Sequence, residues 1–329
     1  MRKLYFLLPG TTGKFACGGL FAALNALALA QQVCSAEVVT YRQREPNTLF
    51  LADALKKPED VIFVLSWGFD VPKLAKQLRS HHTLYHAHSS GYGFRLPANV
   101  PIITVSRNTM GYWGQWAPNS LIYYLPNQIS DRFSNLNQPR DIDVLVQARK
   151  SSEYLLQTLV PALQQQCKVM VLDSFVEDLS QIFNRAKVYL YDSAEYWARE
   201  GVTEGFGLQP MEAAACGCQV FSSVNHGLSD YLDPGFNCYK IAGHDSAFDV
   251  QRIMDTLSVS DPFCLPEQML AEYQTENILH RLRTILTEVN TFFDHQEKHA
   301  TNIHPLTSRR IIQLRAQKLF GKLRSKLGT

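Results

Sequence analysis

The sequence predicts an α/β fold in which two doubly wound domains are each built on a parallel sheet. Short apolar runs alternate with helical patterns, the alternation stops at a polar segment before the middle of the chain, and it then begins again. A length of 329 residues suits two domains better than one. With 46% hydrophobic and 19% charged residues, the composition is that of an ordinary globular protein.

The first half of the chain contains short apolar runs that are typical of strands buried on both faces of a parallel sheet. The uncharged stretch from Phe15 to Cys34 is interrupted by glycine, asparagine and glutamine, so we expect a buried helix there rather than a membrane span, with a signal peptide as the minor alternative. The expected helix is Gly19–Val33, and the expected strands are Leu4–Leu8, Ala36–Thr40, Val61–Leu65, Thr83–Ala87, Ile102–Val105 and Leu121–Tyr124.

A polar segment rich in Asn, Gln, Pro and Ser, Pro126–Asp141, is typical of a linker, and the alternating pattern restarts after it. Two such units in tandem predict two Rossmann-like domains whose strand ends face one cleft, with an N-terminal domain of residues 1–126 and a C-terminal domain of residues 127–300. The second unit has expected strands at Ile142–Val146, Lys168–Leu172, Lys187–Tyr191 and Gln219–Ser222, expected helices at Glu153–Gln166, Val176–Asn184 and Gly207–Cys216, and a helical pattern from Gln251 onward.

Charge and cysteine usage exclude several classes of protein. The net charge of +2 argues against a nucleic-acid partner. Seven scattered cysteines without a Cys-x-x-Cys pair indicate reduced thiols and a cytoplasmic protein. The segment Gly10–Lys14 lacks the first glycine and the Ser/Thr of a P-loop, and no dinucleotide fingerprint or His-Glu-x-x-His metal motif is present.

One segment carries a specific pattern. In EGFGLQPMEA two carboxylates, Glu204 and Glu212, are separated by seven residues, and a glycine-rich turn between them leads into a helix. Glycines let the backbone approach a ligand closely, and the first amides of a helix bind anions such as a diphosphate. Glu212, about one turn into the helix, can accept hydrogen bonds from a ribose diol. The pattern therefore predicts a site for a phosphorylated nucleoside.

This segment, with the following AACGCQVFSS, resembles the donor site of retaining glycosyltransferases, especially glycosyltransferase family 4 with its GT-B fold. Weaker similarities to the family follow in the family's order along residues 1–240. The Gly18-Gly19 pair resembles the phosphate loop, and Tyr85–His88 resembles the strand that ends in the active-site histidine. Ile103–Ser106 resembles a later strand, and Leu125–Asn127 resembles the domain crossover. The resemblance implies two Rossmann-like domains facing a cleft, followed by C-terminal helices.

The resemblance also implies roles for named residues. His88 and Glu204 would be the catalytic pair, with His88 contacting the transferred sugar or the phosphate and Glu204 holding the sugar or stabilising positive charge on it. The donor would be a nucleoside-diphosphate sugar, and neither a metal nor another cofactor would be required. Its diphosphate and sugar would be bound by a further set of residues: Gly18, Gly19, Arg149, Lys150, Phe206, Gly207, Leu208 and Glu212.

The sequence departs from the family pattern at three places. After the domain crossover it has Asn127-Gln128-Ile129-Ser130 where the family has Asn-Gly-Val-Asp. Arg149 and Lys150 are adjacent, whereas the family separates its two cations by several residues, so Lys150 matches more loosely than Arg149. The link Tyr191–Thr203 is longer than usual, and four of its side chains are candidates for shaping the acceptor or donor pocket: Glu195, Trp197, Arg199 and Glu200. Two other functions remain open at this point: a sugar-nucleotide epimerase or hydrolase, and a sugar-nucleotide-binding protein without catalysis.

The acceptor is expected on the N-terminal domain, as a glycan, a lipid-linked sugar or a small molecule. Two aromatic segments expected to be loops, Ser90–Phe94 and Met110–Trp116, suit sugar stacking or lipid contact, and a hydrophobic cluster under a loop explains them equally well. The tail, residues 301–329, has seven basic and no acidic residues from Ser308 onward and apolar residues at helical spacing. It predicts a helix that either lies on an anionic membrane, making the protein peripheral, or docks on the protein itself.

Overall fold

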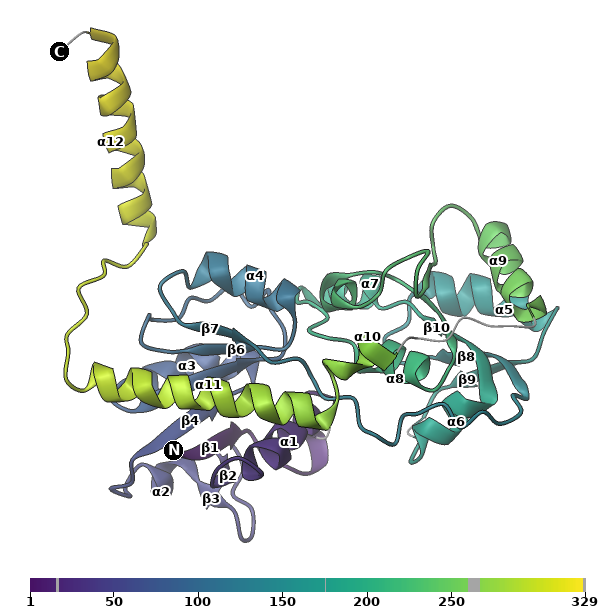
Figure 1. Ribbon diagram of the computed structural model, residues 1–329, viewed down its shortest axis with the longest axis horizontal. Helices are drawn as coiled ribbons and strands as arrows, with labels where there is room; N and C mark the ends of the chain where they lie inside the picture. Colours follow the sequence, from purple (N-terminus) through teal and green to yellow (C-terminus); the bar gives the residue numbers. More distant parts are fainter. Residues whose placement is uncertain (16–17, 175, 260–266, 328–329) are drawn as a thin grey trace.

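The computed structural model describes residues 1–15, 18–174, 176–259 and 267–327. These residues form two α/β domains side by side, each with a parallel sheet between layers of helices (Figure 1). The fold class expected from the sequence is confirmed. A connection without helix or strand in the described residues, between Tyr124 and Ile142, joins the two sheets where the linker was predicted.

The first domain contains a seven-stranded parallel sheet in the order β3-β2-β1-β4-β5-β6-β7. The run VIFVL of β4 is buried at every position because helices cover both faces of the sheet. The elements are β1 (Lys3–Leu8), α1 (Gly18–Gln31), β2 (Ala36–Thr40), β3 (Leu49–Phe50), α2 (Leu51–Ala54), β4 (Val61–Leu65), α3 (Val71–Gln77), β5 (His82–Ala87), β6 (Ile102–Thr104), α4 (Arg107–Trp116) and β7 (Ile122–Tyr124).

The second domain contains a five-stranded parallel sheet in the order β12-β11-β10-β8-β9. Its elements are β8 (Ile142–Gln147), a π-helical turn (Leu155–Leu159), α5 (Val160–Gln164), β9 (Val169–Leu172), α6 (Leu179–Arg185), β10 (Ala186–Tyr191), α7 (Ala194–Glu200), α8 (Leu208–Ala215), β11 (Gln219–Ser222), β12 (Tyr239–Lys240) and α9 (Ser246–Ser258), followed by α10 (Glu267–Ala271). The π turn precedes Pro161, which has no N–H to continue a regular helix.

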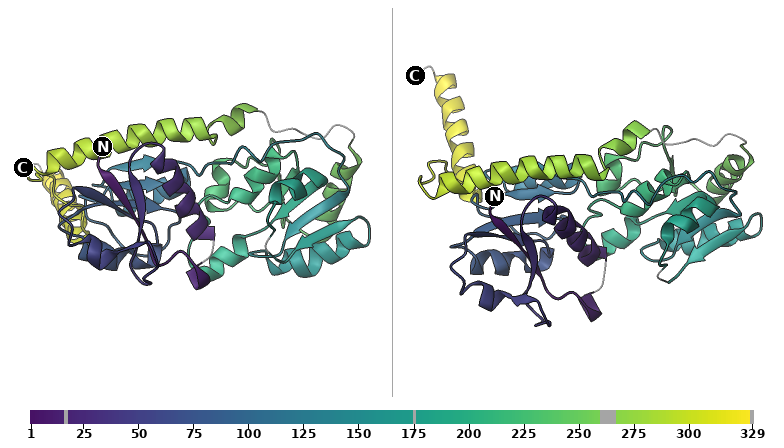
Figure 2. Two further views of the ribbon diagram at one scale, coloured as in Figure 1. Left: turned by 90° about the horizontal axis from the view of Figure 1, so that it is seen from below. Right: turned by 60° about the horizontal axis from the view of Figure 1, so that its bottom comes forward.

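The long helix α11 (Thr275–Gln296) returns to the first domain and lies across it (Figure 2). It buries Ile278, Leu282, Ile285, Leu286, Val289 and Phe293, which share one face at helical spacing. Their partners are residues of the first sheet and of α1, among them Leu4 and Phe6. The expected C-terminal domain of residues 127–300 thus includes a helix that contributes to the core of the N-terminal domain.

The last helix, α12 (Ser308–Leu327), extends away from both domains (Figures 1 and 2). The preceding segment is tied to the first domain by one hydrogen bond of 3.0 Å, from the Leu306 amide to Oδ1 of Asn119. None of the helices that the structure describes is long and apolar enough to cross a membrane. Among the described cysteines, Cys34, Cys167, Cys216, Cys218 and Cys238 are free thiols, whereas Cys17 and Cys264 lie outside the described residues.

Two expected loops are helices in the structure. Met110–Trp116 belongs to α4, which Ser106 caps by accepting a hydrogen bond from the Thr109 amide. Trp113 is only 1% exposed and contacts Tyr85 and Phe94, so these aromatic rings form part of the domain core and not a sugar-stacking surface. Within the link Tyr191–Thr203, residues 194–200 form α7, which ends at Gly201 in a left-handed conformation.

Candidate functional site

Glu204 lies in the interior of the second domain, 5% exposed, just beyond the carboxyl end of β10. The hydroxyl of Tyr191 and the Nε1–H of Trp197 each donate a hydrogen bond of 2.6 Å to Oε2 of Glu204. Burial and the nearby carboxylate raise the pKa of Tyr191 well above its usual range, so its hydroxyl remains a donor. Two donors therefore hold the carboxylate in one orientation.

The positive charge of Lys150 lies near the other carboxylate oxygen of Glu204, Oε1. Its Nζ lies 4.0 Å from Oε1 of Glu204 and 4.3 Å from the ring centroid of Trp197. The Lys150 backbone is left-handed, with φ of +69°, which is uncommon for a residue with a side chain and occurs at functional sites. Arg149 is exposed to solvent. Of the two adjacent cations, the structure thus brings Lys150 to Glu204.

The turn after Glu204 runs against the end of β5. A Cβ on Gly205 would lie 1.6 Å from the carbonyl oxygen of His88, and a Cβ on Gly227 would lie 2.2 Å from the carbonyl oxygen of Gly205. Glycine is therefore required at both positions by close backbone approach. The Gly227 amide donates a hydrogen bond of 3.0 Å to the Glu204 carbonyl. The backbone of His88 and the turn after Glu204 therefore lie against each other from opposite domains, and the catalytic pairing of the His88 and Glu204 side chains stays a prediction.

Hydrogen bonds next to this contact join the two domains. The Ser90 amide donates to Oγ1 of Thr203 at 2.9 Å, and the Thr203 amide donates to the Ser90 carbonyl at 3.1 Å. The Ser89 hydroxyl donates to the Thr203 carbonyl at 2.6 Å. The segment after β5 therefore lies along the segment that leads into the glycine-rich turn, so that a ligand at the turn would contact both domains.

The turn continues into α8. Gly207, with φ of +78°, caps the helix, and Leu208 is its first residue. The Phe206 ring is buried against Tyr231 and Tyr273, so its backbone amide is the part of Phe206 that can bind a ligand. Amides at the start of a helix are suited to an anion. The turn thus leads directly into α8 at residues 206–208, and donor binding by their backbone amides stays a prediction.

Glu212 lies one turn inside α8. Burial raises its pKa to about 7, although the positive charge of Arg132 acts in the opposite direction. A carboxyl group with a pKa near neutrality ionises readily when hydrogen-bond donors such as ribose hydroxyls approach it.

His88 is stacked on a second histidine. The rings of His86 and His88 have centroids 4.1 Å apart, and the Nε2 atoms of both are buried without a hydrogen-bond partner among the described residues. Burial lowers the pKa of His88 to about 4 and that of His86 well below its usual value. Both rings are therefore neutral at pH 7 and can accept or donate one hydrogen bond per nitrogen, according to tautomer.

Gly18 and Gly19 begin α1 and are exposed, while the two residues before them lie outside the described residues. In both figures α1 lies on the side of the first domain that faces the second domain (Figures 1 and 2). The contact of Gly18 and Gly19 with the donor stays a prediction.

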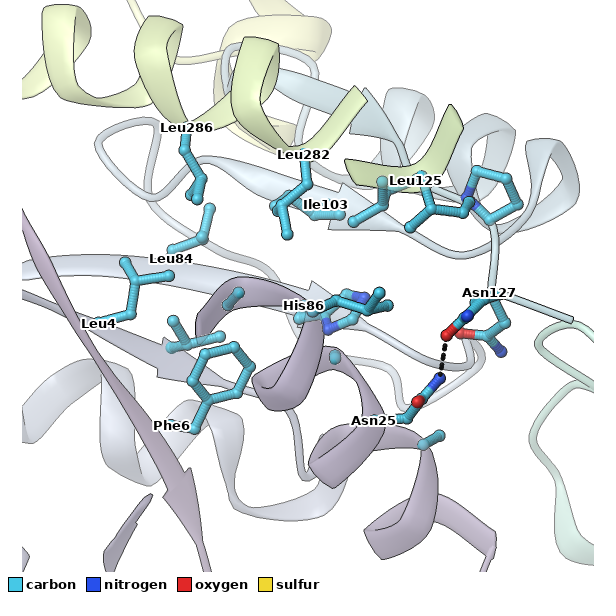
Figure 3. A pocket seen from close by; sticks show the side chains of 18 residues that line it. Leu4, Phe6, Asn25, Leu84, His86, Ile103, Leu125, Asn127, Leu282 and Leu286 are labelled. Atoms are coloured by element: carbon cyan, nitrogen blue, oxygen red, sulfur yellow. Dashed lines mark hydrogen bonds between the residues drawn. The ribbon is translucent and has the colours of Figure 1, made fainter. Parts of the chain in front are cut away.

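A cavity of about 40 Å³ lies behind His86, between α1, α11 and the sheet (Figure 3). Apolar side chains form most of its wall, and Asn25 and Gln128 close one end with a hydrogen bond of 3.4 Å. It has room for a water molecule and not for a sugar nucleotide. A larger groove, of about 710 Å³, lies between α4, β7 and α11 and includes Arg107 and Arg281 in its wall.

The sequence reasoning missed His226 and Asn225, which precede Gly227. His226 adopts a positive φ of 53°, and burial lowers its pKa while the negative charge of Glu204 acts to raise it. Oδ1 of Asn225 is buried without a partner among the residues described. The only sequence signal is an Asn-His-Gly turn directly after a strand, which is common in α/β proteins.

Among the residues that the structure describes, one group of side chains lies close enough together to hold a metal ion: Asp60, His82 and Glu297. Arg2 already binds two of them, with 2.7 Å from its Nε to Asp60 and 3.1 Å from a terminal nitrogen to Glu297. The cluster belongs to the amino-terminal edge of the first sheet, opposite the edge that carries His88. It is therefore a surface ion-pair network, and the expectation that the reaction needs no metal remains a prediction.

Known proteins share both the site segment and the fold. Residues 127–265, about two fifths of the chain, match the family model for glycosyl transferases group 1. This match includes Glu204, Glu212 and Lys150 and supports glycosyl transfer as the activity. No curated protein matches the chain at a significant level.

Solved structures of glycosyltransferases resemble most of the chain, across both domains. Sucrose-phosphate synthase from Thermosynechococcus elongatus has a TM-score of 0.64 at 15% identity, covering 88% of this chain and 100% of the other. A glycosyltransferase from Rickettsia africae has a TM-score of 0.60 at 11% identity, covering 89% and 98%. Anabaena HepE in complex with UDP-glucose has a TM-score of 0.54 at 14% identity, covering 90% and 98%. The GT-B fold is thereby confirmed.

Proposed function

We propose that this protein is a retaining, metal-independent hexosyltransferase of the family 4 type, which moves a sugar from a nucleoside-diphosphate sugar to an acceptor bound on the N-terminal domain. The observation that carries the proposal is the contact between Gly205 and His88, which places the glycine-rich turn of one domain against the strand end of the other. In this proposal the donor and the acceptor meet at that contact once the two segments separate.

The donor occupies the second domain in this proposal. Glu212 binds the nucleoside ribose, and the amides of residues 206–208 bind the sugar hydroxyls or the diphosphate. Lys150, with Arg149 and the amides near Gly18 and Gly19, compensates the negative charge of the departing nucleoside diphosphate. This charge compensation takes the place that a divalent cation has in other glycosyltransferases.

Glu204 is the acid nearest the sugar. Held by Tyr191 and Trp197, its carboxylate stabilises the positive charge that develops at the anomeric carbon and is not assigned as a covalent nucleophile. Neutral His88 forms a hydrogen bond with the transferred sugar or with the phosphate from the opposite domain. Glu204 is almost fully buried here, so the segments 88–90 and 201–205 must separate to admit the donor and close again over it.

The helix α12 suggests where the reaction takes place. It carries Arg309, Arg310, Arg315 and Lys318 in the sequence without an acidic residue, and Ile312, Leu319 and Phe320 are exposed on it at the spacing of one helix face. A basic helix with an apolar stripe binds the surface of an anionic bilayer. We infer that α12 attaches the protein peripherally to such a surface, which would favour a lipid-linked acceptor.

A panel of sugar nucleotides tests the proposed donor. Thermal unfolding is measured with UDP-, GDP-, ADP- and TDP-sugars, beginning with UDP-glucose because HepE was solved in complex with it. A true donor raises the melting temperature by linkage. Acceptor-dependent release of the nucleoside diphosphate then supports the transferase. Consumption of the donor without an acceptor would favour a hydrolase or epimerase, and binding without turnover would favour a binding protein.

A further inference from the structure

The helix α7 is not held in place by the hydrophobic core. None of its seven residues is buried, whereas the neighbouring α8 buries five. What fixes α7 is polar contact: the Glu195 carboxylate accepts a hydrogen bond of 3.0 Å from the Glu153 amide, and the Trp197 indole donates to Glu204. A short helix without a buried face forms through such tertiary contacts and not through its own propensity.

The contacts of α7 converge on the two charged groups of the donor site. Trp197 uses its N–H for Oε2 of Glu204 and its ring face for the ammonium of Lys150, at 4.3 Å from the ring centroid. Tyr191, at the end of β10, donates to the same oxygen of Glu204. Oε1 of Glu204 therefore remains on the side of Lys150, 4.0 Å from its Nζ. One indole ring thus fixes the distance between an acid and a cation.

The end of α7 also lies at the domain interface. Gly201 closes the helix with φ of +67°, and a Cβ on Gly91 of the first domain would lie 3.1 Å from the Gly201 carbonyl oxygen. Two residues later, Thr203 forms the hydrogen bonds to Ser90. The segment that presents Trp197 is therefore held against the first domain while it holds Glu204.

We propose that Trp197, assisted by Tyr191, is a positioning residue that sets the orientation of Glu204 relative to Lys150. The inference rests on the proposed function, because the orientation matters only if Glu204 faces a transferred sugar. Because Trp197 acts through Glu204, its loss affects the sugar-transfer step and leaves binding of the free nucleoside diphosphate nearly intact. A misplaced charged group of this kind costs roughly 10- to 100-fold in rate.

The test uses the full chain with Trp197→Phe, which keeps a ring beneath Lys150 and removes the indole N–H. Tyr196→Phe is the matched control, since Tyr196 is the adjacent aromatic residue of α7 and its ring centroid lies 5.8 Å from Nζ of Lys150. We expect kcat to fall about 10-fold in Trp197→Phe, with the affinity for the free nucleoside diphosphate changed less than about threefold. Tyr191→Phe should behave similarly, and Tyr196→Phe should match the wild type.

A second measurement is independent of turnover. In a double-mutant cycle followed by urea unfolding, Trp197→Phe should reduce the folding equilibrium constant several-fold more in the wild type than in the Glu204→Gln background. Equal kcat for Trp197→Phe and Tyr196→Phe, or additive effects in the cycle, would overturn the proposal. If the wild type uses none of the sugar nucleotides, the proposed function fails, while the cycle still decides whether Trp197 holds Glu204.

Discussion

The ammonium of Lys150 lies 4.0 Å from Oε1 of Glu204, across the carboxyl edge of the second sheet, whereas the adjacent Arg149 is exposed. In the proposed reaction, the acid assigned to the sugar and the cation assigned to the diphosphate are thereby neighbours. This arrangement suits a bond cleavage in which positive charge develops on the sugar and negative charge on the departing phosphate. The Glu204 carboxylate would stabilise the first charge and the Lys150 ammonium the second.

From this relationship we expect Lys150→Ala to weaken binding of the nucleoside diphosphate roughly 10-fold, since a partly buried charge–phosphate contact is lost. Arg149→Ala should weaken it less than about threefold because that side chain points to solvent. Calorimetric titration of both variants with the nucleoside diphosphate of the best donor measures the difference. A larger loss for Arg149→Ala would place the diphosphate on the other side of the turn.

Glu212 should make the stability of the protein fall as the pH rises. Its pKa is about 7 in the folded protein, above the ordinary value of 4.5, so the folded state binds more protons between these limits. Unfolding free energy should therefore decrease by about 2 kcal/mol between pH 5 and pH 8 on account of this group. Glu212→Gln should remove that decrease in urea unfolding at the two pH values. An unchanged pH dependence would show that Glu212 is solvated.

His88 should make the stability of the protein fall as the pH falls, the opposite of the effect expected for Glu212. Its pKa of about 4 lies below the ordinary 6.5, so the unfolded state binds more protons between these values and stability is lost as the pH falls from 6.5 toward 4. The loss attributable to His88 is about 2 kcal/mol at pH 4.5. His86 has a lowered pKa for the same reason and remains in His88→Asn, which should therefore flatten only part of the acid dependence in urea unfolding. A variant with the full wild-type acid dependence would contradict a buried, neutral His88.

The helix α12 should bind anionic vesicles. Reversal of three of its charges should weaken sedimentation with phosphatidylcholine–phosphatidylglycerol vesicles by roughly 100-fold or more, since each basic residue near such a surface contributes about 1 kcal/mol. The variant combines Arg310→Glu, Arg315→Glu and Lys318→Glu. Its matched control reverses three exposed charges of the first domain, Lys73→Glu, Lys76→Glu and Arg79→Glu. Electrostatic attachment would be refuted if the two variants bound the anionic vesicles equally. It would also be refuted if the wild type bound only to vesicles of pure phosphatidylcholine.

The strand Val61–Leu65 was predictable because burial on both faces leaves an apolar run that needs no knowledge of the neighbours, whereas the two-residue strands β3 and β12 were not among the expected strands. Val61–Leu65 and Ala36–Thr40 have the same bounds in the sequence prediction and in the structure. The helix α7 was not predictable, since none of its side chains is buried and no apolar periodicity appears. For α11 the apolar face was visible in the sequence, but not that the chain would return to the first domain to bury it.

Some residues of the candidate site could also be predicted from the local sequence, whereas others depend on tertiary structure. The turn from Glu204 to Glu212 was identified from local spacing and from its resemblance to the family 4 donor site, because the glycines and the start of the following helix are encoded within ten residues. The difference between Arg149 and Lys150 depends on a left-handed backbone at Lys150, which the sequence does not reveal. The donors to Glu204 from Tyr191 and Trp197 depend on how β10 and α7 are placed, which is a tertiary property.

The most direct test of the donor site compares the full chain with Glu204→Gln and with Glu200→Gln, an exposed acid of α7 that serves as the matched control. Release of nucleoside diphosphate is measured with the donor that stabilises the wild type most, together with an acceptor. We predict that Glu204→Gln loses about 100-fold or more in kcat while still binding the nucleoside diphosphate, and that Glu200→Gln keeps wild-type turnover. Full turnover by Glu204→Gln would contradict the assignment of the donor site.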